Sequence, residues 1–139
     1  MNQQEAVKQG LALVEKSNIA MLGTNGPDGY PHIRAMIKME TEDLKTIWFT
    51  TNTPSPKIAQ LKQNPKACVY FVDFDNWMGL TLIGTVEILQ DPESKQRLWR
   101  DGFEKYYPQG VNDPDYSVLR FTTQQGEYYH ALSVTPFEL

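Results

Sequence analysis

Cysteine is almost absent from this sequence of 139 residues, because Cys68 is the only one. A single cysteine excludes an intramolecular disulfide, which fits a reducing compartment, and we therefore expect a cytoplasmic protein. Histidine is nearly as scarce, with only His32 and His130. Two histidines and one cysteine cannot build a multi-Cys/His metal centre within one chain, so we expect no metal site.

Long hydrophobic runs and an excess of basic residues are also missing. The longest apolar runs, around Val69–Val72 and Leu80–Ile83, are too short to span a bilayer, and the polar start Asn2-Gln3-Gln4-Glu5 is unlike a signal peptide. Thirteen Lys and Arg against seventeen Asp and Glu give a net charge of −4. This balance argues against nucleic acid and against an anionic membrane as partners.

Several catalytic motifs are absent as well. The sequence has no G-x-S-x-G, no phosphate-binding P-loop and no G-x-G-x-x-G. Its acidic residues, such as Asp91 and Glu93, fall in predicted turns or on helix surfaces, where solvated charge is the ordinary interpretation. The sequence therefore offers no apparatus for hydrolysis or phosphoryl transfer, and it assigns no side chain as a catalytic acid, base or nucleophile.

What the sequence does contain is typical of a folded protein. Hydrophobic residues make up 40% and charged residues 22%, and the length suits one domain over residues 1–139. Seven Tyr, six Phe and three Trp are many for this size, and such rings stack on planar ligands or fill subunit interfaces.

Periodicity and turn signals predict three helices and seven strands. The predicted helices cover Gln3–Lys16, a short stretch from Ser55-Pro56 to Asn64-Pro65, and a stretch from Asp91-Pro92 to about Lys105. The predicted strands are Ile19–Leu22, Tyr30–Met39, Leu44–Thr51, Ala67–Phe74, Trp77–Gln90, Tyr116–Thr122 and Glu127–Leu132, the last two joined by a turn at Gln124-Gln125-Gly126.

These strands follow one another through tight turns, which predicts an antiparallel sheet. Six or seven strands in so short a chain remove their edges best by closing into a small barrel, with the helices at its ends or side. Gly79 and Gly84 suggest a bulge or sharp coiling of the barrel wall. We therefore expect a mainly β protein, a six- to seven-stranded antiparallel split barrel with peripheral helices.

One group of residues favours an anion site. Thr50, Thr51 and Ser55 supply hydroxyls, and Lys57 adds a positive charge in the first turn of the second helix, where free N–H groups favour a phosphate. Arg34 is a second candidate, because a guanidinium can bind phosphate oxygens with two hydrogen bonds. Three alternatives stay open: Ser55 only caps the helix, Lys57 is solvated, and Arg34 lies on the outer face of the sheet.

The order of these motifs resembles the pyridoxamine 5′-phosphate oxidase-like family of FMN-binding split barrels, in particular its general stress protein branch. The matching stretches are Gly29–Met36, Trp48–Thr51, Ser55-Pro56-Lys57 with Leu61 and Asn64-Pro65, Gly84–Glu87, and Tyr107–Gly110 with Asp113–Tyr116. The likeness spans nearly the whole chain.

The resemblance implies FMN as the cofactor and a homodimer with two FMN molecules at the subunit interface. It implies that the flavin ring lies against the strand with Arg34, Ala35, Met36 and Ile37 and the strand end with Phe49, Thr50 and Thr51. It implies that Arg34, Ser55 and Lys57 hold the phosphate. Trp77 and Trp99 are the candidates for covering the flavin from a partner subunit. Haem or a deazaflavin replaces FMN in some relatives of this fold.

The resemblance favours an oxidoreductase that moves hydride or electrons between a reduced nicotinamide, or similar donor, and a small acceptor. The alternative is a non-catalytic FMN-binding stress protein, a flavin carrier or redox sensor. A third hypothesis is an unliganded barrel that binds other molecules, such as oligonucleotides. No equivalent of the oxidase's C-terminal Arg and His is evident before Leu139, so oxidation of pyridoxamine phosphate is not the expected reaction.

Overall fold

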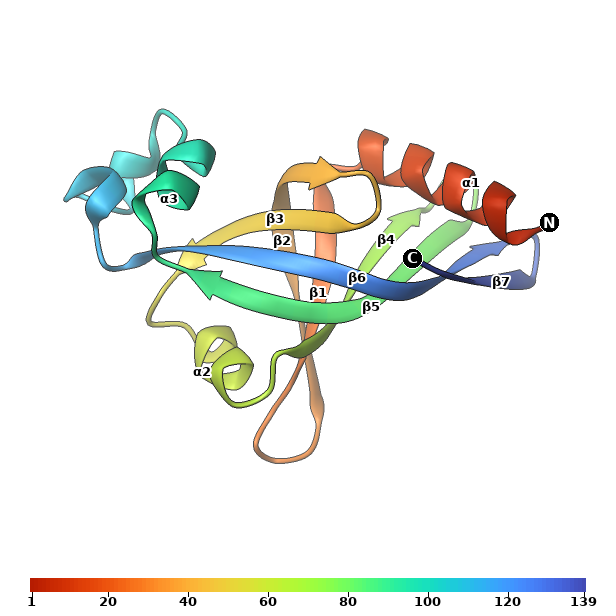
Figure 1. Ribbon diagram of the computed structural model, residues 1–139, viewed down its shortest axis with the longest axis horizontal. Coiled ribbons are helices and arrows are strands. Elements are labelled where there is room, and N and C mark those ends of the chain that lie inside the picture. Colours follow the sequence, from red (N-terminus) through yellow and green to blue (C-terminus); the bar gives the residue numbers. More distant parts are fainter.

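Seven strands and three α-helices build the computed structural model, which describes residues 1–139 (Figure 1). The helices are α1 (Gln3–Lys16), α2 (Pro56–Gln63) and α3 (Pro92–Leu98), with short 3-10 turns at Phe103–Lys105 and Gly110–Asn112. The strands are β1 (Ile19–Asn25), β2 (Pro31–Glu42), β3 (Thr46–Asn52), β4 (Lys66–Asp73), β5 (Met78–Leu89), β6 (Tyr116–His130) and β7 (Ser133–Glu138). No helix combines the length and apolar character needed to cross a bilayer.

The sheet closes on itself through one long strand. The strand order is β3-β2-β1-β4-β5-β6-β7, and β6 also pairs with β3, so six strands form a closed antiparallel barrel. The first half of β6 pairs with β3 from Tyr116 to Thr122, and its second half pairs with β7 from Gln125 to His130. The predicted mainly β antiparallel barrel is confirmed.

The bulge expected near Gly84 is present, but its extra residue is Gln124 of the facing strand β6. The register between β5 and β6 shifts between Ile83 and Gly84, and a Cβ atom at Gly84 would collide with the carbonyl oxygen of Thr122. Gly79 has a different role, since its pairing is regular and a side chain there would collide with the hydroxyl of Tyr70. One glycine therefore accommodates the bulge, and the other makes room for a ring.

Two predicted boundaries are wrong. The chain does not turn at Gln124-Gln125-Gly126, because β6 runs unbroken to His130 and reverses at Ala131 and Leu132, whose φ angles are 51° and 64°. Gly126 serves packing instead, because a Cβ there would collide with the Phe137 ring of β7. The third helix ends at Leu98 and not at Lys105, and Gly102 follows it in the left-handed conformation with φ 98°.

The main core fills the barrel. Its largest buried side chains include Phe49, Phe71 and Phe121, and α1 closes one end of the core with Leu13 and Val14. A smaller second cluster of Trp48, Leu98, Tyr116 and Val118 lies under α3. In Figure 1, α1 and α3 lie toward opposite ends of the molecule. The segment that follows β5 therefore forms a separate layer at one end of the barrel.

Candidate functional site

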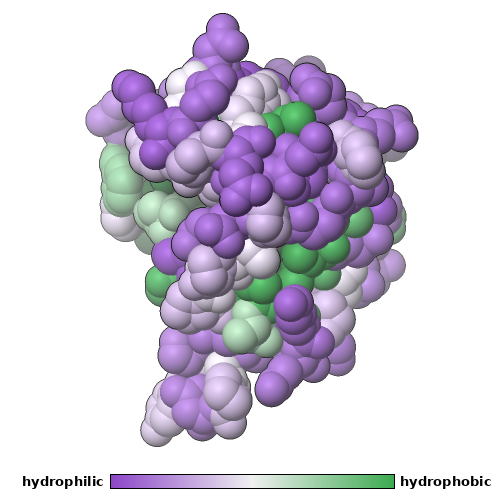
Figure 2. Space-filling model, turned by 90° about the vertical axis from the view of Figure 1, so that its left-hand side faces the viewer, coloured by the Kyte–Doolittle hydropathy of each residue, from purple (hydrophilic) through white to green (hydrophobic).

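An open groove lies between the barrel and the segment that follows α3. Its volume is about 580 Å³. Figure 2 looks onto this end of the molecule, where apolar side chains reach the surface beneath a largely hydrophilic upper part. The lining residues come from β2 (Ala35, Met36, Ile37, Met39), β3 (Thr50, Thr51, Asn52), α2 (Lys57) and the segment after α3 (Arg100, Phe103, Tyr106, Tyr107).

Adjacent strands explain one wall of this groove. Strands β2 and β3 pair side by side, with Lys38 opposite Phe49, so the stretch around Ile37 lies next to Thr50 and Thr51. Alternation along β2 leaves Ile37 65% exposed, whereas Met36 beside it is only 7% exposed. The structure thus brings six predicted residues into one lining: Ala35, Met36, Ile37, Thr50, Thr51 and Lys57.

Two cations meet at the start of α2 without a carboxylate partner. Lys57 Nζ donates to Thr51 Oγ1 at 2.8 Å. The Arg34 guanidinium donates to Thr24 Oγ1 at 2.7 Å, and at 3.2 Å to both the Leu22 carbonyl and Gln60 Oε1. All these acceptors are neutral, so neither positive charge is balanced by an acidic side chain.

The pKa shifts of these cations have clear causes. Burial lowers the pKa of Lys57, and the positive charge of Arg34 lowers it further. Burial also lowers the pKa of the Arg34 guanidinium. Two partly desolvated like charges destabilise each other unless an anion lies between or beside them. This end of the groove therefore has the electrostatics of an anion site.

Ser55 lies directly before α2, as predicted, but its side chain does not cap the helix. Its backbone is extended (φ −106°, ψ 153°), and Pro56 begins the helix. The hydroxyl makes no capping hydrogen bond, and Ser55 Oγ is buried without any hydrogen-bond partner. Buried hydroxyls are nearly always hydrogen-bonded. The unpaired Ser55 hydroxyl, two positions before Lys57 in the chain, therefore requires an explanation. An anion at the start of α2 would supply the missing acceptor.

Five of the predicted ligand-binding residues do not line the groove: Arg34, Phe49, Ser55, Trp77 and Trp99. Arg34 and Ser55 lie near the start of α2, beyond the lining residue Lys57. Phe49 is fully buried in the main core, because its side chain points to the opposite face of β3 from its neighbour Thr50. Trp99 packs against Phe103 and Tyr107, with ring centroids 5.5 and 6.4 Å away, and so supports two lining residues from behind. Trp77 is 62% exposed and lines a different, apolar hollow.

The sequence does not predict the second wall of the groove. Arg100, Phe103, Tyr106 and Tyr107 come from an irregular stretch that was predicted as helix up to Lys105 and as loop beyond. A concentration of aromatic residues beside Gly102 was the available signal, but it carries no period that points to a particular face. Met39 and Asn52, the other missed residues, directly extend predicted stretches of β2 and β3.

The comparison with known families rests on the whole sequence. A sequence model of the family described as pyridoxamine 5′-phosphate oxidase matches residues 6–130. The chain belongs to this family. The resemblance noted from the motifs is thereby confirmed. No curated protein matches the sequence.

Several solved structures are similar to this chain, among them one described as a member of the pyridoxinephosphate oxidase family. A protein from Clostridium acetobutylicum, related to general stress protein 26 of B. subtilis, is 45% identical, with 100% of this chain and 97% of that chain covered and a TM-score of 0.87. General stress protein 26 of Bacillus anthracis is 19% identical over the whole of both chains (TM-score 0.76). A heme-binding protein of Mycobacterium smegmatis is 17% identical, covering 96% of this chain and 57% of that one (TM-score 0.78). The last two likenesses concern the fold alone.

Proposed function

We propose that this chain binds FMN in the groove and acts as an FMN-dependent oxidoreductase. The observation that carries the proposal is the unbalanced pair Arg34 and Lys57 beside the orphaned hydroxyl of Ser55, at the end of a groove lined by apolar side chains. A phosphate monoester supplies the negative charge and acceptor oxygens that these groups lack. An apolar groove with a few polar groups suits a flat aromatic ring.

The residues present fit this ligand. Lys57 and Arg34 would hold the phosphate by charge-assisted hydrogen bonds, and Ser55 would donate its hydroxyl to a phosphate oxygen. Ala35, Met36 and Ile37 would form the apolar wall for the ring, and Thr50 and Asn52 offer polar atoms beside it. When bound, FMN supplies hydride and single-electron chemistry between a donor such as a reduced nicotinamide and a small acceptor.

The residue types that line the groove also limit the chemistry that its side chains can perform. No Asp, Glu, His or Cys lines the groove. The residues present can orient a ligand and exclude water, but they offer no carboxylate or imidazole as a general base. This composition supports hydride transfer in preference to reactions that begin with proton abstraction from a substrate.

A homodimer is the second part of the proposal. Ile33, Ala35 and Ile37 alternate along β2 on one exposed face, where Ile33 is 68% and Ile37 65% exposed. Ile19 of β1 lies opposite Ile37 and is 48% exposed. Because Ile37 also lines the groove, this apolar strip is continuous with the proposed flavin site. A second copy covering the strip would enclose the ring, which supports FMN at the subunit interface.

The alternative is FMN binding without catalysis, as in a flavin carrier or redox sensor. The test has two stages, of which the first is the visible spectrum and mass of whatever ligand purified protein carries or takes up. A flavin spectrum and the mass of FMN are expected, whereas a haem spectrum would contradict the proposal. In the second stage NADH or NADPH is added without oxygen, followed by candidate acceptors. Turnover supports an oxidoreductase. If no donor reduces the bound flavin, the result supports a flavin carrier without catalysis.

A further inference from the structure

Residues 92–115, here named the outer segment, carry the second wall of the groove and are tied to the barrel at both ends. Near the first end, Lys95 Nζ donates at 2.9 Å to Oε1 of Gln90, which directly follows β5, and at 2.9 Å to the Asp113 carbonyl within the segment itself. At the second end, the Thr53 N–H donates to the Asp115 carbonyl at 2.7 Å. Both ends of the segment are therefore fixed, and between them the rings of Trp99, Phe103 and Tyr107 pack against Tyr116 of β6.

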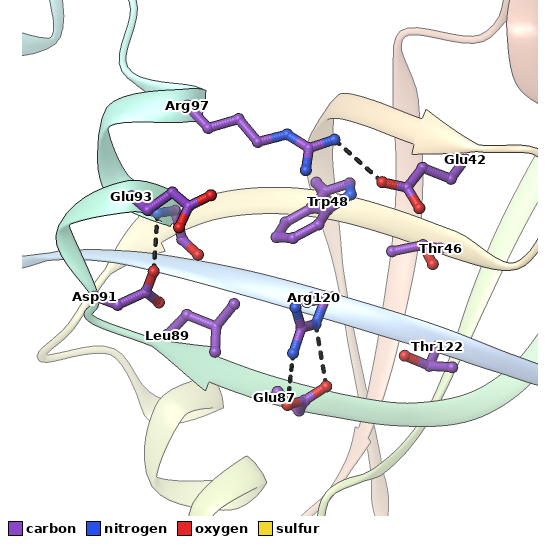
Figure 3. Close-up of a pocket in the computed structure, with 11 residues that line it drawn as sticks. Glu42, Thr46, Trp48, Glu87, Leu89, Asp91, Glu93, Arg97, Arg120 and Thr122 are labelled. Atoms are coloured by element: carbon purple, nitrogen blue, oxygen red, sulfur yellow. Dashed lines mark hydrogen bonds and ion pairs between the residues drawn. The ribbon is translucent and has the colours of Figure 1, made fainter.

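In the middle of the outer segment, one side chain alone forms hydrogen bonds to the barrel. Among residues 96–112 this is Arg97, whose Nε donates to Glu40 Oε2 at 2.7 Å and whose Nη2 donates to Glu42 Oε1 at 3.2 Å. Its Cζ lies 4.5 Å from the centre of the Trp48 ring. Figure 3 shows the side chain reaching from α3 across Trp48 toward Glu42. The two carboxylates also raise the pKa of Arg97.

This contact links the elements that carry the two walls of the groove, although Arg97, Glu40 and Glu42 do not line it themselves. Glu40 and Glu42 belong to β2, the strand that supplies Ala35–Ile37 to the barrel wall. On the other side, the Arg97 carbonyl accepts a hydrogen bond from Arg100 Nη1 at 3.0 Å, and Arg100 lines the groove. The Arg97 side chain also borders a polar cavity of about 560 Å³, so water would replace the ion pairs if they broke. No neighbouring side chain repeats these hydrogen bonds.

We propose that Arg97 is a positioning residue: its clamp on Glu40, Glu42 and Trp48 holds the outer wall of the groove against the barrel and sets how long FMN stays bound. The inference rests on the proposed function for its ligand, although the clamp itself is a property of the chain. Loss of the clamp lets the wall carrying Phe103 and Tyr106 open more often, and a ligand then leaves faster. The barrel wall and the cations at α2 are not altered by this change.

The experiment compares Arg97→Gln with Arg120→Gln. Arg120 borders the same cavity, pairs with Glu87 at 2.8 Å and lies 5.4 Å from the Trp48 ring, but all its partners belong to the barrel. The first readout is hydrogen exchange of the Tyr106 and Tyr107 amides in flavin-free protein, since both donate to the Phe103 carbonyl at 2.9 Å. The second is the dissociation rate of FMN from loaded protein.

Arg97→Gln should speed both exchange and FMN dissociation about three- to tenfold, the effect expected of a small network of exposed ion pairs. Arg120→Gln should change neither. The double variant Glu40→Gln/Glu42→Gln should speed exchange and dissociation as much as Arg97→Gln does. Arg97→Lys should speed them less than Arg97→Gln, because a lysine keeps the charge but not the planar guanidinium.

Unchanged exchange in Arg97→Gln would overturn the clamp, and so would an equal effect of Arg120→Gln. Faster exchange with an unchanged FMN dissociation rate would overturn its role in ligand retention. If wild-type protein binds no FMN, the proposed function fails, while the exchange comparison still decides whether Arg97 holds the wall.

Discussion

Replacing Lys57 with methionine should separate ligand binding from folding. Methionine keeps an unbranched side chain only one atom shorter but removes the charge and the hydrogen-bond donor. One charge-assisted hydrogen bond to a phosphate is worth about 1.5–3 kcal/mol. Because 1.4 kcal/mol corresponds to tenfold, the dissociation constant for FMN should rise about 10- to 100-fold. In flavin-free protein Lys57→Met should instead increase the stability of the fold, because the variant loses a partly buried charge that Arg34 repels.

The pH dependence gives a second readout of Lys57. A lysine whose pKa is lowered in the folded state destabilises the fold while it is charged, and this cost disappears as the pH rises through the lowered pKa. Flavin-free wild type should therefore gain stability relative to Lys57→Met as the pH approaches the ordinary lysine value of about 10.4. Thermal unfolding at a series of pH values measures this difference.

The assay for binding is a titration of flavin-free protein followed by FMN fluorescence. Lys62→Met is the matched control, because Lys62 is exposed in the last turn of the same helix and does not line the groove. It should leave the dissociation constant within about twofold of wild type, as surface substitutions usually do. An unchanged dissociation constant in Lys57→Met, or an equal loss in the control, would refute the reasoning.

Three further outcomes are expected. Ile33→Asp should turn the dimer into a monomer in sedimentation velocity, because it places a charge on the exposed strip of β2; a wild type that is already monomeric would contradict the interface. Gly84→Ala should destabilise the fold by about 1–3 kcal/mol in urea, since its Cβ meets the Thr122 carbonyl, and a change below 0.5 kcal/mol would count against the bulge. The Asn76 side chain, followed by the Lys16 ammonium, lowers the pKa of Asp73, so this group contributes stability above about pH 4 that is lost as the pH falls. Asp73→Asn should flatten that acid limb, and an acid limb identical to wild type would show that Asp73 is not its source.

The barrel could be predicted because its signals are local. The Ser55-Pro56 start and the Asn64-Pro65 end of α2 fix that helix, and alternation identifies β2. The β6–β7 reversal could not be predicted, because it uses Ala131 and Leu132 at positive φ in place of glycine. Gly126 gave a false turn signal, since its lack of a side chain serves the Phe137 ring, a contact visible only in the folded sheet.

The residues of the candidate site likewise fall into those that local sequence signals predict and those that they do not. Lys57 and Arg34 could be predicted because a helix start and a strand alternation suggested their neighbourhood. The outer wall with Phe103 and Tyr106 could not, because an irregular segment has no repeating face. Arg97 also escaped prediction, since its partners Glu40 and Glu42 lie more than fifty residues away in the chain. Only the three-dimensional arrangement joins them.

The most direct measurement compares FMN with riboflavin, which has the same ring and ribityl chain but no phosphate. Both are titrated into flavin-free protein at one salt concentration. If Arg34, Ser55 and Lys57 hold the phosphate, FMN should bind at least about a hundredfold more tightly, since two or more charge-assisted hydrogen bonds are lost with riboflavin. Equal affinities, or no binding of either flavin, would contradict the proposed site.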